Sequence, residues 1–368
     1  MEILFAIKSI NAVGGGAERV LAEISNGLAE RGHHVSILTY DLPYGNSFYP
    51  LHRSINRINL GIGNTEGRST IFETLQRIIS LRRTVVQTNP DVVVGFMHSM
   101  FIPLGLALLG TKFSVIASEH IGVEHYRSRP YERLLLKLTP YITKNTTVIS
   151  EKLRNGFNVQ LRNHMIVIPN PVSVPEDNRT GKIKSSFTRK RILSVGRLVP
   201  QKDHQTLIDA YAMLVDDFPE WDLRIFGDGE LRPQLETQVK ALGLEGRVQL
   251  AATTPNLTEE YLCAQLFVNS SRYESFGLAT AEALTYCLPV VGFADCSGTN
   301  ELIRHNYNGI LVQGTDRANV LADGMRRLMS SSELRQSLGN AGPSSMAAFS
   351  TEKICCQWEE LLQKWHRI

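Results

Sequence analysis

Short runs of apolar residues recur along the chain and alternate with longer stretches that carry apolar residues at helical spacing. Continuous apolar runs of this kind are typical of parallel strands that are buried on both faces, and the stretches between them predict the covering helices. The pattern therefore predicts an α/β fold built on parallel sheets. In the first half, the predicted strands are Ile3–Ile7, Val35–Leu38, Val92–Phe96, Ser114–Ala117, Thr147–Ile149 and Ile166–Ile168.

The series of strands starts again after a polar, proline-containing segment at residues 169–191. The second set consists of Ile192–Val195, Leu223–Phe226, Val248–Leu250, Leu266–Val268, Pro289–Gly292 and Ile310–Val312, with helices predicted at Gln205–Leu214, Leu231–Leu242 and Thr280–Tyr286. We expect two Rossmann-like domains, residues 1–170 and 171–350, with ligands at the carboxyl ends of the strands and in a central cleft. Apolar residues at helical spacing in 351–368 predict a terminal amphipathic helix that packs back on the first domain.

The composition predicts an ordinary folded protein, and no recognisable export signal argues against a location in the cytoplasm. Of the 368 residues, 43% are hydrophobic and 20% are charged, which excludes disordered and fibrous classes. The five cysteines show no metal-ligand spacing, and Lys8 interrupts the first apolar run too early for a signal peptide. The long apolar stretch Val92–Gly110 contains His98 and Pro103, so it is interpreted as strand, turn and buried helix.

Charge is unevenly placed along the chain. Residues 1–185 contain 21 Lys and Arg against 14 Asp and Glu, a net +7, whereas the remainder contains 18 against 22, a net −4. Such asymmetry suggests that the first domain meets an anionic partner, phosphate or a membrane surface, although it is equally compatible with uneven surface charge. No motif of a nucleic-acid-binding module is present, so nucleic acid is not an expected partner.

Two glycine-containing loops could approach a phosphate. Gly14, Gly15 and Gly16 follow the first strand and open a helix, whose N–H groups and dipole favour an anion. The segment is not GxGxxG, and a turn needed only for chain reversal is the alternative. In the second domain, Arg197 and Lys202 lie five residues apart in the loop after a strand, where two cations would neutralise a diphosphate.

The stretch Ser271–Leu284 contains two glutamates at informative positions. Glu274 lies in a loop after a buried strand, and Glu282 lies inside a helix that starts near Gly277. Carboxylates at these places can accept hydrogen bonds from sugar hydroxyls, while the N–H groups of Phe276, Gly277 and Leu278 would face an anion. A solvent-facing Glu282 is the alternative.

Together these motifs resemble the retaining, nucleotide-sugar-dependent glycosyltransferases of GT-B fold, family 4 type, which build polysaccharides, lipopolysaccharides such as O-antigen, and glycolipids. The resemblance spans nearly the whole chain and rests on the glutamate pair with FG between, together with further matches in family order. These are GGAER at Gly15–Arg19, SEH at Ser118–His120, VGRLVPQKD at Val195–Asp203, FGDGELR at Phe226–Arg232 and NGILV at Asn308–Val312.

The resemblance implies a role for each matching residue. Gly15 and Gly16 would lie against the donor diphosphate, Arg197 and Lys202 would bind that diphosphate, and Glu282 would hold the ribose hydroxyls. Glu274 would contact the transferred sugar, and the N–H groups of Phe276, Gly277 and Leu278 would complete the cradle. His120 would lie in the acceptor domain beside the reacting sugar. His120 and Glu274 are therefore the predicted catalytic residues.

One departure concerns the loop Asp295–Glu301, which replaces the commoner glycine-glycine-proline-glutamate form while keeping Gly298 and Glu301. No Asp-x-Asp pair is present to hold a divalent metal on the diphosphate. Arg197 and Lys202 would take that role, so we expect a metal-independent enzyme without a cofactor.

The implied function is transfer of a hexose or N-acetylhexosamine from a UDP- or GDP-linked donor to a hydroxyl group, with retention of configuration. The segment Arg68–Arg83 places apolar residues on one helix face beside four arginines, so it could bind an anionic bilayer or a lipid diphosphate, although packing against the domain is favoured. A polyprenyl-diphosphate-linked saccharide is the preferred acceptor, with a free saccharide as the alternative. The enzyme is expected in the cytoplasm, where it could bind peripherally to the inner face of the cytoplasmic membrane. A non-catalytic nucleotide-sugar-binding protein and a nicotinamide-dependent oxidoreductase remain as alternative functions.

Overall fold

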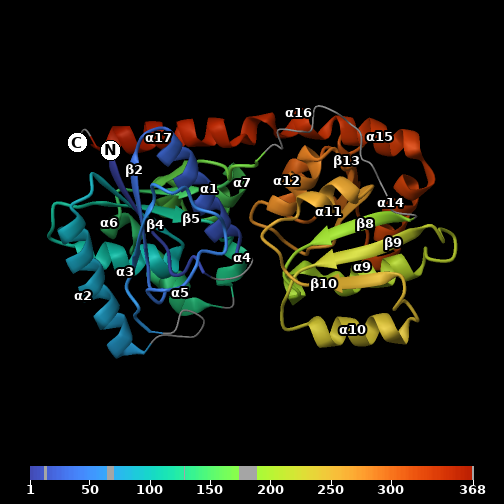
Figure 1. The fold of residues 1–368 in the computed structure, drawn as a ribbon, viewed down its shortest axis with the longest axis horizontal. Coiled ribbons are helices and arrows are strands. Elements are labelled where there is room, and N and C mark those ends of the chain that lie inside the picture. The colour runs from blue at the N-terminus through green and yellow to red at the C-terminus, as the bar shows by residue number, and fades with distance from the viewer. Residues whose placement is uncertain (12–14, 64–69, 128, 174–188, 367–368) are drawn as a thin grey trace. The chain divides into compact units, whose positions relative to one another are not determined.

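The computed structural model describes residues 1–11, 15–63, 70–127, 129–173 and 189–366, and the chain divides into two compact units. One unit consists of Met1–Pro171 with Thr351–Ile368, and the other of Val172–Ser350. Each contains one parallel sheet against which helices pack (Figure 1). The predicted α/β class with two Rossmann-like sheets is confirmed. Most of the predicted connecting segment at 169–191 lies outside the described residues.

The N-terminal unit has seven parallel strands in the order β3-β2-β1-β4-β5-β6-β7. They are β1 (Glu2–Ala6), β2 (His34–Thr39), β3 (Asn56–Asn59), β4 (Val92–Phe96), β5 (Val115–Glu119), β6 (Asn145–Val148) and β7 (Met165–Val167). Six match the apolar runs of the sequence to within two residues. The unpredicted strand, β3, is an edge strand of sequence NRIN that is not buried, so no apolar run marks it.

The helices of this unit include the C-terminal segment of the chain. They are α1 (Gly16–Glu30), α2 (Ile71–Thr88), α3 (His98–Leu108), α4 (Val123–Tyr126), α5 (Pro130–Leu136), α6 (Thr139–Ile142), α7 (Glu151–Gly156), α8 (Val159–Arg162) and α17 (Thr351–His366). Helix α17 packs along α1 (Figure 1). Its Trp358 ring lies 6.2 Å from Phe5 and 6.0 Å from Phe96, so the helix covers the middle of the sheet.

The C-terminal unit has six parallel strands in the order β10-β9-β8-β11-β12-β13. They are β8 (Lys190–Val195), β9 (Trp221–Phe226), β10 (Val248–Ala251), β11 (Leu266–Asn269), β12 (Val290–Phe293) and β13 (Gly309–Val312). The α-helices are α9 (His204–Ala212), α10 (Arg232–Ala241), α11 (Thr258–Cys263), α12 (Leu278–Thr285), α13 (Thr299–Leu302), α14 (Arg317–Ser330), α15 (Ser332–Asn340) and α16 (Gly342–Met346). The described part of the unit also contains the 3₁₀ turns η2 (Pro200–Lys202) and η3 (Ala347–Phe349).

Helix α2 is rotated relative to the sequence-based expectation. The side chains of Ile71 and Phe72 are 83% and 76% exposed, and Leu75 and Ile79 are exposed as well. The buried side chains are those of Arg77, Leu81 and Val85. Packing of the Ile71-containing face was therefore the wrong expectation, because Leu81, Val85 and the apolar stem of Arg77 fill the inner side of the helix.

The arginines of α2 are also engaged differently from the expectation. Arg77 donates to the carbonyl of Ile62 and lies over the Tyr40 ring, 4.4 Å from its centroid. Arg82 donates to the carbonyls of Ala107 and Leu109. Arg68 lies outside the described residues. Within the described ranges, no helix combines the length and apolar composition needed to cross a bilayer.

Candidate active site

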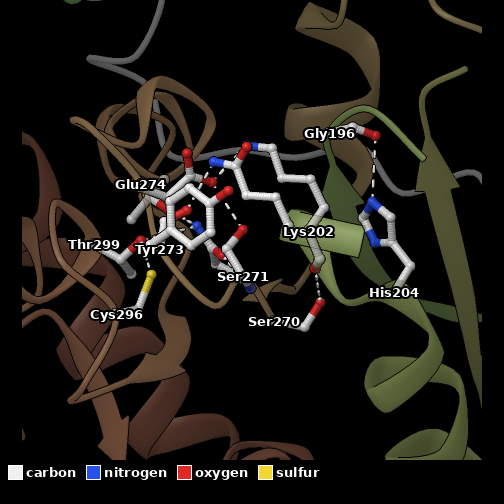
Figure 2. A network of polar contacts seen from close by, with 12 residues as sticks. Gly196, Lys202, His204, Ser270, Ser271, Tyr273, Glu274, Cys296 and Thr299 are labelled. Atoms are coloured by element: carbon white, nitrogen blue, oxygen red, sulfur yellow. Dashed lines mark hydrogen bonds and ion pairs between the residues drawn. The ribbon is translucent and has the colours of Figure 1, made fainter. Parts of the chain in front are cut away.

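The C-terminal unit brings several predicted donor-binding residues to one edge of its sheet. The chain runs outward from β8 through β9 to β10 and then returns to β11, so β8 and β11 are neighbours at a topological switch point. Loops that follow two such strands diverge and leave room for a ligand. Lys202 and Arg197 follow β8, and Glu274 follows β11. Figure 2 shows Lys202 extending toward Glu274 from the other loop.

Lys202 and Glu274 form a short ion pair. The Nζ atom of Lys202 lies 2.5 Å from Oε1 of Glu274, and the hydroxyl of Ser271 donates to the same oxygen at 2.8 Å (Figure 2). The Lys202 and Glu274 side chains are only 19% and 10% exposed, so screening by water is limited. Among the described residues no donor reaches Oε2 of Glu274. That oxygen is therefore available to accept a hydrogen bond from a ligand.

Polar contacts between the two loops hold this pair in place. The backbone N–H of Arg272 donates to the carbonyl of Gln201, and the side chain of Gln201 donates to the carbonyl of Tyr273, both at 2.9 Å. Ser270 Oγ donates to the carbonyl of Lys202 at 2.8 Å. Gln201, Ser270 and Ser271 were not predicted as site residues, because their contacts depend on loops that meet only in the folded protein.

A buried carboxylate and a distant arginine support the same loops. Asp203 has φ +53°, in the left-handed region that Asp tolerates better than most residues. Its Oδ2 atom lies 3.2 Å from Nε of Arg317, whose Nη2 donates to the carbonyls of Ser270 and Ser271. Arg317 begins α14 and belongs to no motif, so nothing in the sequence marked it.

The unusual loop Asp295–Glu301 lies directly against the Glu274 loop. The N–H of Glu274 donates to the carbonyl of Ser297 at 3.0 Å, and Ser297 Oγ donates back to the Glu274 carbonyl at 3.3 Å. Gly298 has φ +78°, and a Cβ there would lie 2.8 Å from the Glu274 carbonyl oxygen. Glycine is required at this position, which explains why the loop Asp295–Glu301 retains it although the rest of its sequence differs from the commoner form.

The backbone after Glu274 presents the predicted cradle. Gly277 has φ +89° and forms the N-cap of α12, an eight-residue helix. Within the described chain, the N–H groups of Phe276, Gly277 and Leu278 donate to no protein acceptor. Arg197 is exposed and its guanidinium forms no ion pair with a described residue. The unit therefore offers three N–H groups and a cation for an anionic ligand.

Glu282 is buried within α12, which excludes the solvent-facing alternative. Glu282 is only 4% exposed, and its Oε2 atom accepts a hydrogen bond of 2.8 Å from the hydroxyl of Tyr261. Tyr261 comes from α11 and stacks on Tyr286, with ring centroids 5.0 Å apart. The tyrosine therefore holds the orientation of the carboxylate.

The predicted glycine loop belongs to the N-terminal unit. Gly15 is the N-cap of α1 and Gly16 is its first residue, directly after β1 and its loop. Gly14 lies outside the described residues. The fifteen-residue helix α1 has an acidic residue, Glu18, in its first turn.

His120 follows β5 at the carboxyl edge of the N-terminal sheet. Its Nε2 atom lies 2.9 Å from Ser118 Oγ, which accepts a hydrogen bond from Thr147. The imidazole stacks on Phe96, with centroids 5.1 Å apart and an interplanar angle of 17°. Burial lowers the pKa of His120 to about 4, so the ring is neutral at pH 7. A neutral imidazole can both donate and accept a hydrogen bond.

A second polar network adjoins His120. The hydroxyl of Tyr126 donates to Oε2 of Glu119 at 2.8 Å and lies 2.8 Å from Nδ1 of His98. Burial raises the pKa of Glu119 to about 7, and burial is also the main cause that lowers the pKa of His98 to about 4. His98 Nε2 lies 3.3 Å from Oε2 of Glu132, which His125 approaches to 3.5 Å. Neither His98 nor His125 belongs to a motif that the sequence offers.

Comparison with known proteins assigns the family. The model described as Glycosyltransferase Family 4 matches residues 14–175, and that described as Glycosyl transferases group 1 matches residues 177–345. Between them the two models account for most of the chain. The chain belongs to the family 4 type of glycosyltransferases. The predicted family is therefore confirmed, and the enzyme is a transferase that acts in the synthesis of polysaccharides or other glycans.

Individual relatives are similar in sequence over nearly the whole length of this glycosyltransferase. An uncharacterized glycosyltransferase of Haemophilus influenzae is 26% identical over 98% of this chain and 99% of its own. The GalNAc-alpha-(1->4)-GalNAc-alpha-(1->3)-diNAcBac-PP-undecaprenol alpha-1,4-N-acetyl-D-galactosaminyltransferase of Campylobacter jejuni is also 26% identical, over 98% of both chains. The crystal structure of Anabaena HepE with UDP-glucose matches with a TM-score of 0.80 and 19% identity, over 98% of this chain and 99% of that chain. The predicted GT-B fold is confirmed.

Proposed function

We propose that this glycosyltransferase transfers a hexose or N-acetylhexosamine from a UDP- or GDP-linked donor, with retention of configuration, to a hydroxyl of a polyprenyl-diphosphate-linked saccharide. The observation that carries the donor half is the Lys202–Glu274 pair, which places a cation and a carboxylate oxygen side by side between two loops. HepE, which has a similar fold, was crystallised with UDP-glucose. The relative from Campylobacter jejuni is named for an undecaprenol-diphosphate-linked acceptor.

The donor site acts by electrostatics and positioning. Lys202 retains two N–H donors beyond the one directed at Glu274, and Arg197 is exposed beside the same strand end. Both cations would stabilise the negative charge that develops on the departing diphosphate. The N–H groups of Phe276 to Leu278 would bind further phosphate oxygens.

Each glutamate would bind a different part of the donor. Oε2 of Glu274 would accept a hydrogen bond from a hydroxyl of the transferred sugar and so orient its anomeric carbon. Glu282, held by Tyr261, would bind the ribose hydroxyls. Neither glutamate would serve as the acid or nucleophile of a glycosidase pair. In this proposal the acceptor would instead attack from the front face, through an oxocarbenium-like ion pair.

The acceptor half of the reaction belongs to the N-terminal unit in this proposal. His120 is neutral and would hydrogen-bond a sugar hydroxyl beside the reacting centre. Gly15 and Gly16 open α1 in the same unit, and the N–H groups there would lie against the donor diphosphate. No resident cofactor is required, and the cations of the donor site make the reaction independent of a metal ion.

Docking on an anionic membrane would bring the enzyme to a lipid-linked acceptor. The exposed apolar face of α2, formed by Ile71, Phe72, Leu75 and Ile79, is suited to the interfacial region of a bilayer. The net positive charge of residues 1–185 adds attraction to anionic lipid. The proposal places the enzyme peripherally on the inner face of the cytoplasmic membrane.

The test is a panel of UDP- and GDP-sugars assayed for release of nucleoside diphosphate, first into water and then with a polyprenyl-diphosphate-linked saccharide. Proton NMR of the product reports the anomeric configuration. An α-linked product from an α-linked donor supports retention, and an inverted product contradicts it. Binding of a nucleotide sugar without any turnover, with or without acceptor, would support a non-catalytic nucleotide-sugar-binding protein instead.

A further inference from the structure

A basic pocket lies on the N-terminal unit beside the His120 network. It has a volume of about 270 Å³ and is formed where α4 and α5 meet α7 and α8. Three cationic side chains line it, those of Arg127, Arg133 and Lys137, together with the apolar side chains of Val123, Phe157 and Leu161. The lining of the pocket thus combines cationic and apolar side chains.

The three cations have no carboxylate partner among the residues that the structure describes. All three are exposed, and none forms an ion pair with a described residue. No carboxylate is among the residues that line the pocket. The neighbouring Glu132 is bound by Arg129 at 3.0 Å and approached by two histidines, so its charge is directed elsewhere. A cluster of three unpaired cations favours a multiply charged anion, for which a diphosphate is suited.

Exposed apolar side chains continue from the pocket along α5 and α6. We call them the α5 apolar row, which consists of Tyr131, Leu134, Leu135, Leu138 and Tyr141. Tyr131 is 83% exposed and Leu134 is 60% exposed, and both lie within two residues of the cation Arg133 in the sequence. Large apolar side chains left in water beside a cation cluster indicate a ligand that carries hydrocarbon next to its charge.

The pocket is connected to the candidate catalytic histidine by a shared residue. Tyr126 lines the pocket, and its hydroxyl donates to Glu119, which directly precedes His120. A ligand anchored in the pocket would therefore begin close to the residue that is proposed to face the acceptor sugar.

We propose that this pocket binds the diphosphate of a polyprenyl-diphosphate-linked acceptor, with the prenyl chain lying along the α5 apolar row. The inference rests on the lipid-linked acceptor of the proposed function and assigns the diphosphate to Arg127, Arg133 and Lys137. It differs from the alternative that arginines of α2 bind this group, since two of those arginines, Arg77 and Arg82, are engaged with backbone carbonyls.

The test measures binding, so it does not depend on turnover. Co-sedimentation is compared for neutral phosphatidylcholine vesicles, the same vesicles doped with a polyprenyl diphosphate, and vesicles with phosphatidylglycerol at equal charge. The triple variant Arg127→Gln, Arg133→Gln, Lys137→Gln is compared with a control that loses the same charge at exposed sites of the same unit. The control is Arg53→Gln, Lys112→Gln, Lys364→Gln. Circular dichroism and thermal melting establish that both variants are folded.

The wild type and the control should bind the diphosphate-doped vesicles in preference to both other kinds. The pocket variant should lose this binding by about tenfold or more, because each cation near an anionic headgroup contributes to the attraction. Inorganic pyrophosphate should displace the protein only at much higher concentration than a soluble prenyl diphosphate, because it lacks the hydrocarbon.

Three results would overturn the inference. They are equal binding by the pocket variant and the control, equal binding of wild type to phosphatidylglycerol vesicles, and displacement by pyrophosphate at the same concentration as by prenyl diphosphate. Donor hydrolysis by the wild type is measured in parallel. Loss of diphosphate recognition with intact donor hydrolysis removes only the pocket assignment, whereas diphosphate binding without any use of a nucleotide sugar removes the proposed function.

Discussion

The Nζ atom of Lys202 lies 2.5 Å from Oε1 of Glu274, although 72 residues separate the two along the chain. The contact joins the loop after β8 to the loop after β11, the two strands at the switch point of the C-terminal sheet. It keeps a poorly exposed carboxylate balanced by a cation before any donor binds. It also leaves the remaining N–H groups of Lys202 and Oε2 of Glu274 for the ligand.

Lys202→Ala and Glu274→Gln should each lower donor use. Each change removes a charge-assisted hydrogen bond, which costs about 1.5 to 3 kcal/mol, or roughly 10- to 100-fold in kcat/KM. Steady-state release of nucleoside diphosphate measures the effect. Since both residues share one contact, the double variant should lose less than the product of the two single losses.

The control for this series is Lys190→Ala. Lys190 pairs with Glu220 at 3.2 Å on the surface of the same unit, where both side chains are more than 40% exposed. It should keep wild-type kinetics, because exposed ion pairs contribute little. Unchanged kcat/KM in the Lys202 and Glu274 variants would contradict the donor-site assignment.

Glu282→Gln should weaken binding of the nucleoside diphosphate, and Tyr261→Phe should weaken it less. The first change removes the carboxylate that is proposed to accept from the ribose, while the second removes only the 2.8 Å hydrogen bond that orients it. Isothermal titration calorimetry with the nucleoside diphosphate gives both affinities, and Glu245→Gln at an exposed site serves as control. An affinity equal to wild type for Glu282→Gln would remove this residue from the site.

Stability should fall as the pH is lowered from about 6.5 to about 4, partly because of His204. Burial is the main cause that lowers the pKa of His204 from 6.5 to about 4, and its Nε2 lies 3.3 Å from the carbonyl of Gly196. In this window the unfolded chain takes up a proton that the folded chain does not, so the free energy of unfolding decreases by about 3 kcal/mol. Above pH 6.5 the contribution is fully present.

Urea unfolding at pH 4.5 and pH 7 measures this effect. His204→Gln, which keeps a side-chain donor for the Gly196 carbonyl, should show a smaller pH dependence than wild type. His34→Gln, at an exposed position, should behave as wild type. An unchanged pH dependence in His204→Gln would show that this histidine titrates similarly in the folded and unfolded chains.

Activity should survive an excess of EDTA, because Arg197 and Lys202 are proposed to neutralise the donor phosphates. The measurement is donor turnover before and after chelation, followed by addition of magnesium or manganese. Complete loss with EDTA and recovery with either metal would refute the assignment of this role to the two cations.

Replacing Ile71, Phe72 and Ile79 with serine should reduce sedimentation with phosphatidylglycerol vesicles. These side chains form the exposed apolar face of α2, and their loss removes the hydrocarbon contact with the bilayer. Binding should also weaken as salt rises. Met213→Ser and Leu242→Ser, exposed apolar residues of the other unit, provide the control. Binding that is unchanged in the α2 variant would place any membrane contact elsewhere.

Much of the fold could be predicted because its signals are local. Twelve apolar runs identified twelve strands, since a strand buried on both faces is apolar over most of its length. Strand β3 was not predicted, because an edge strand that is not buried needs no apolar run. The glutamate pair, the cations Arg197 and Lys202, and the SEH segment could be found as motifs. Supporting residues such as Arg317 could not, since they act through contacts between distant segments.

The sequence by itself determined twelve of the strands, the family, and the loops that carry the candidate site, because periodicity and turn chemistry act over a few residues. Only the tertiary structure decided that Lys202 pairs with Glu274 and that Arg127, Arg133 and Lys137 share one pocket. It also decided which side of α2 faces inward. That helix has apolar residues on two sides, and competition for the space beside the sheet buried Leu81 and Val85 and left Ile71 and Phe72 in solvent.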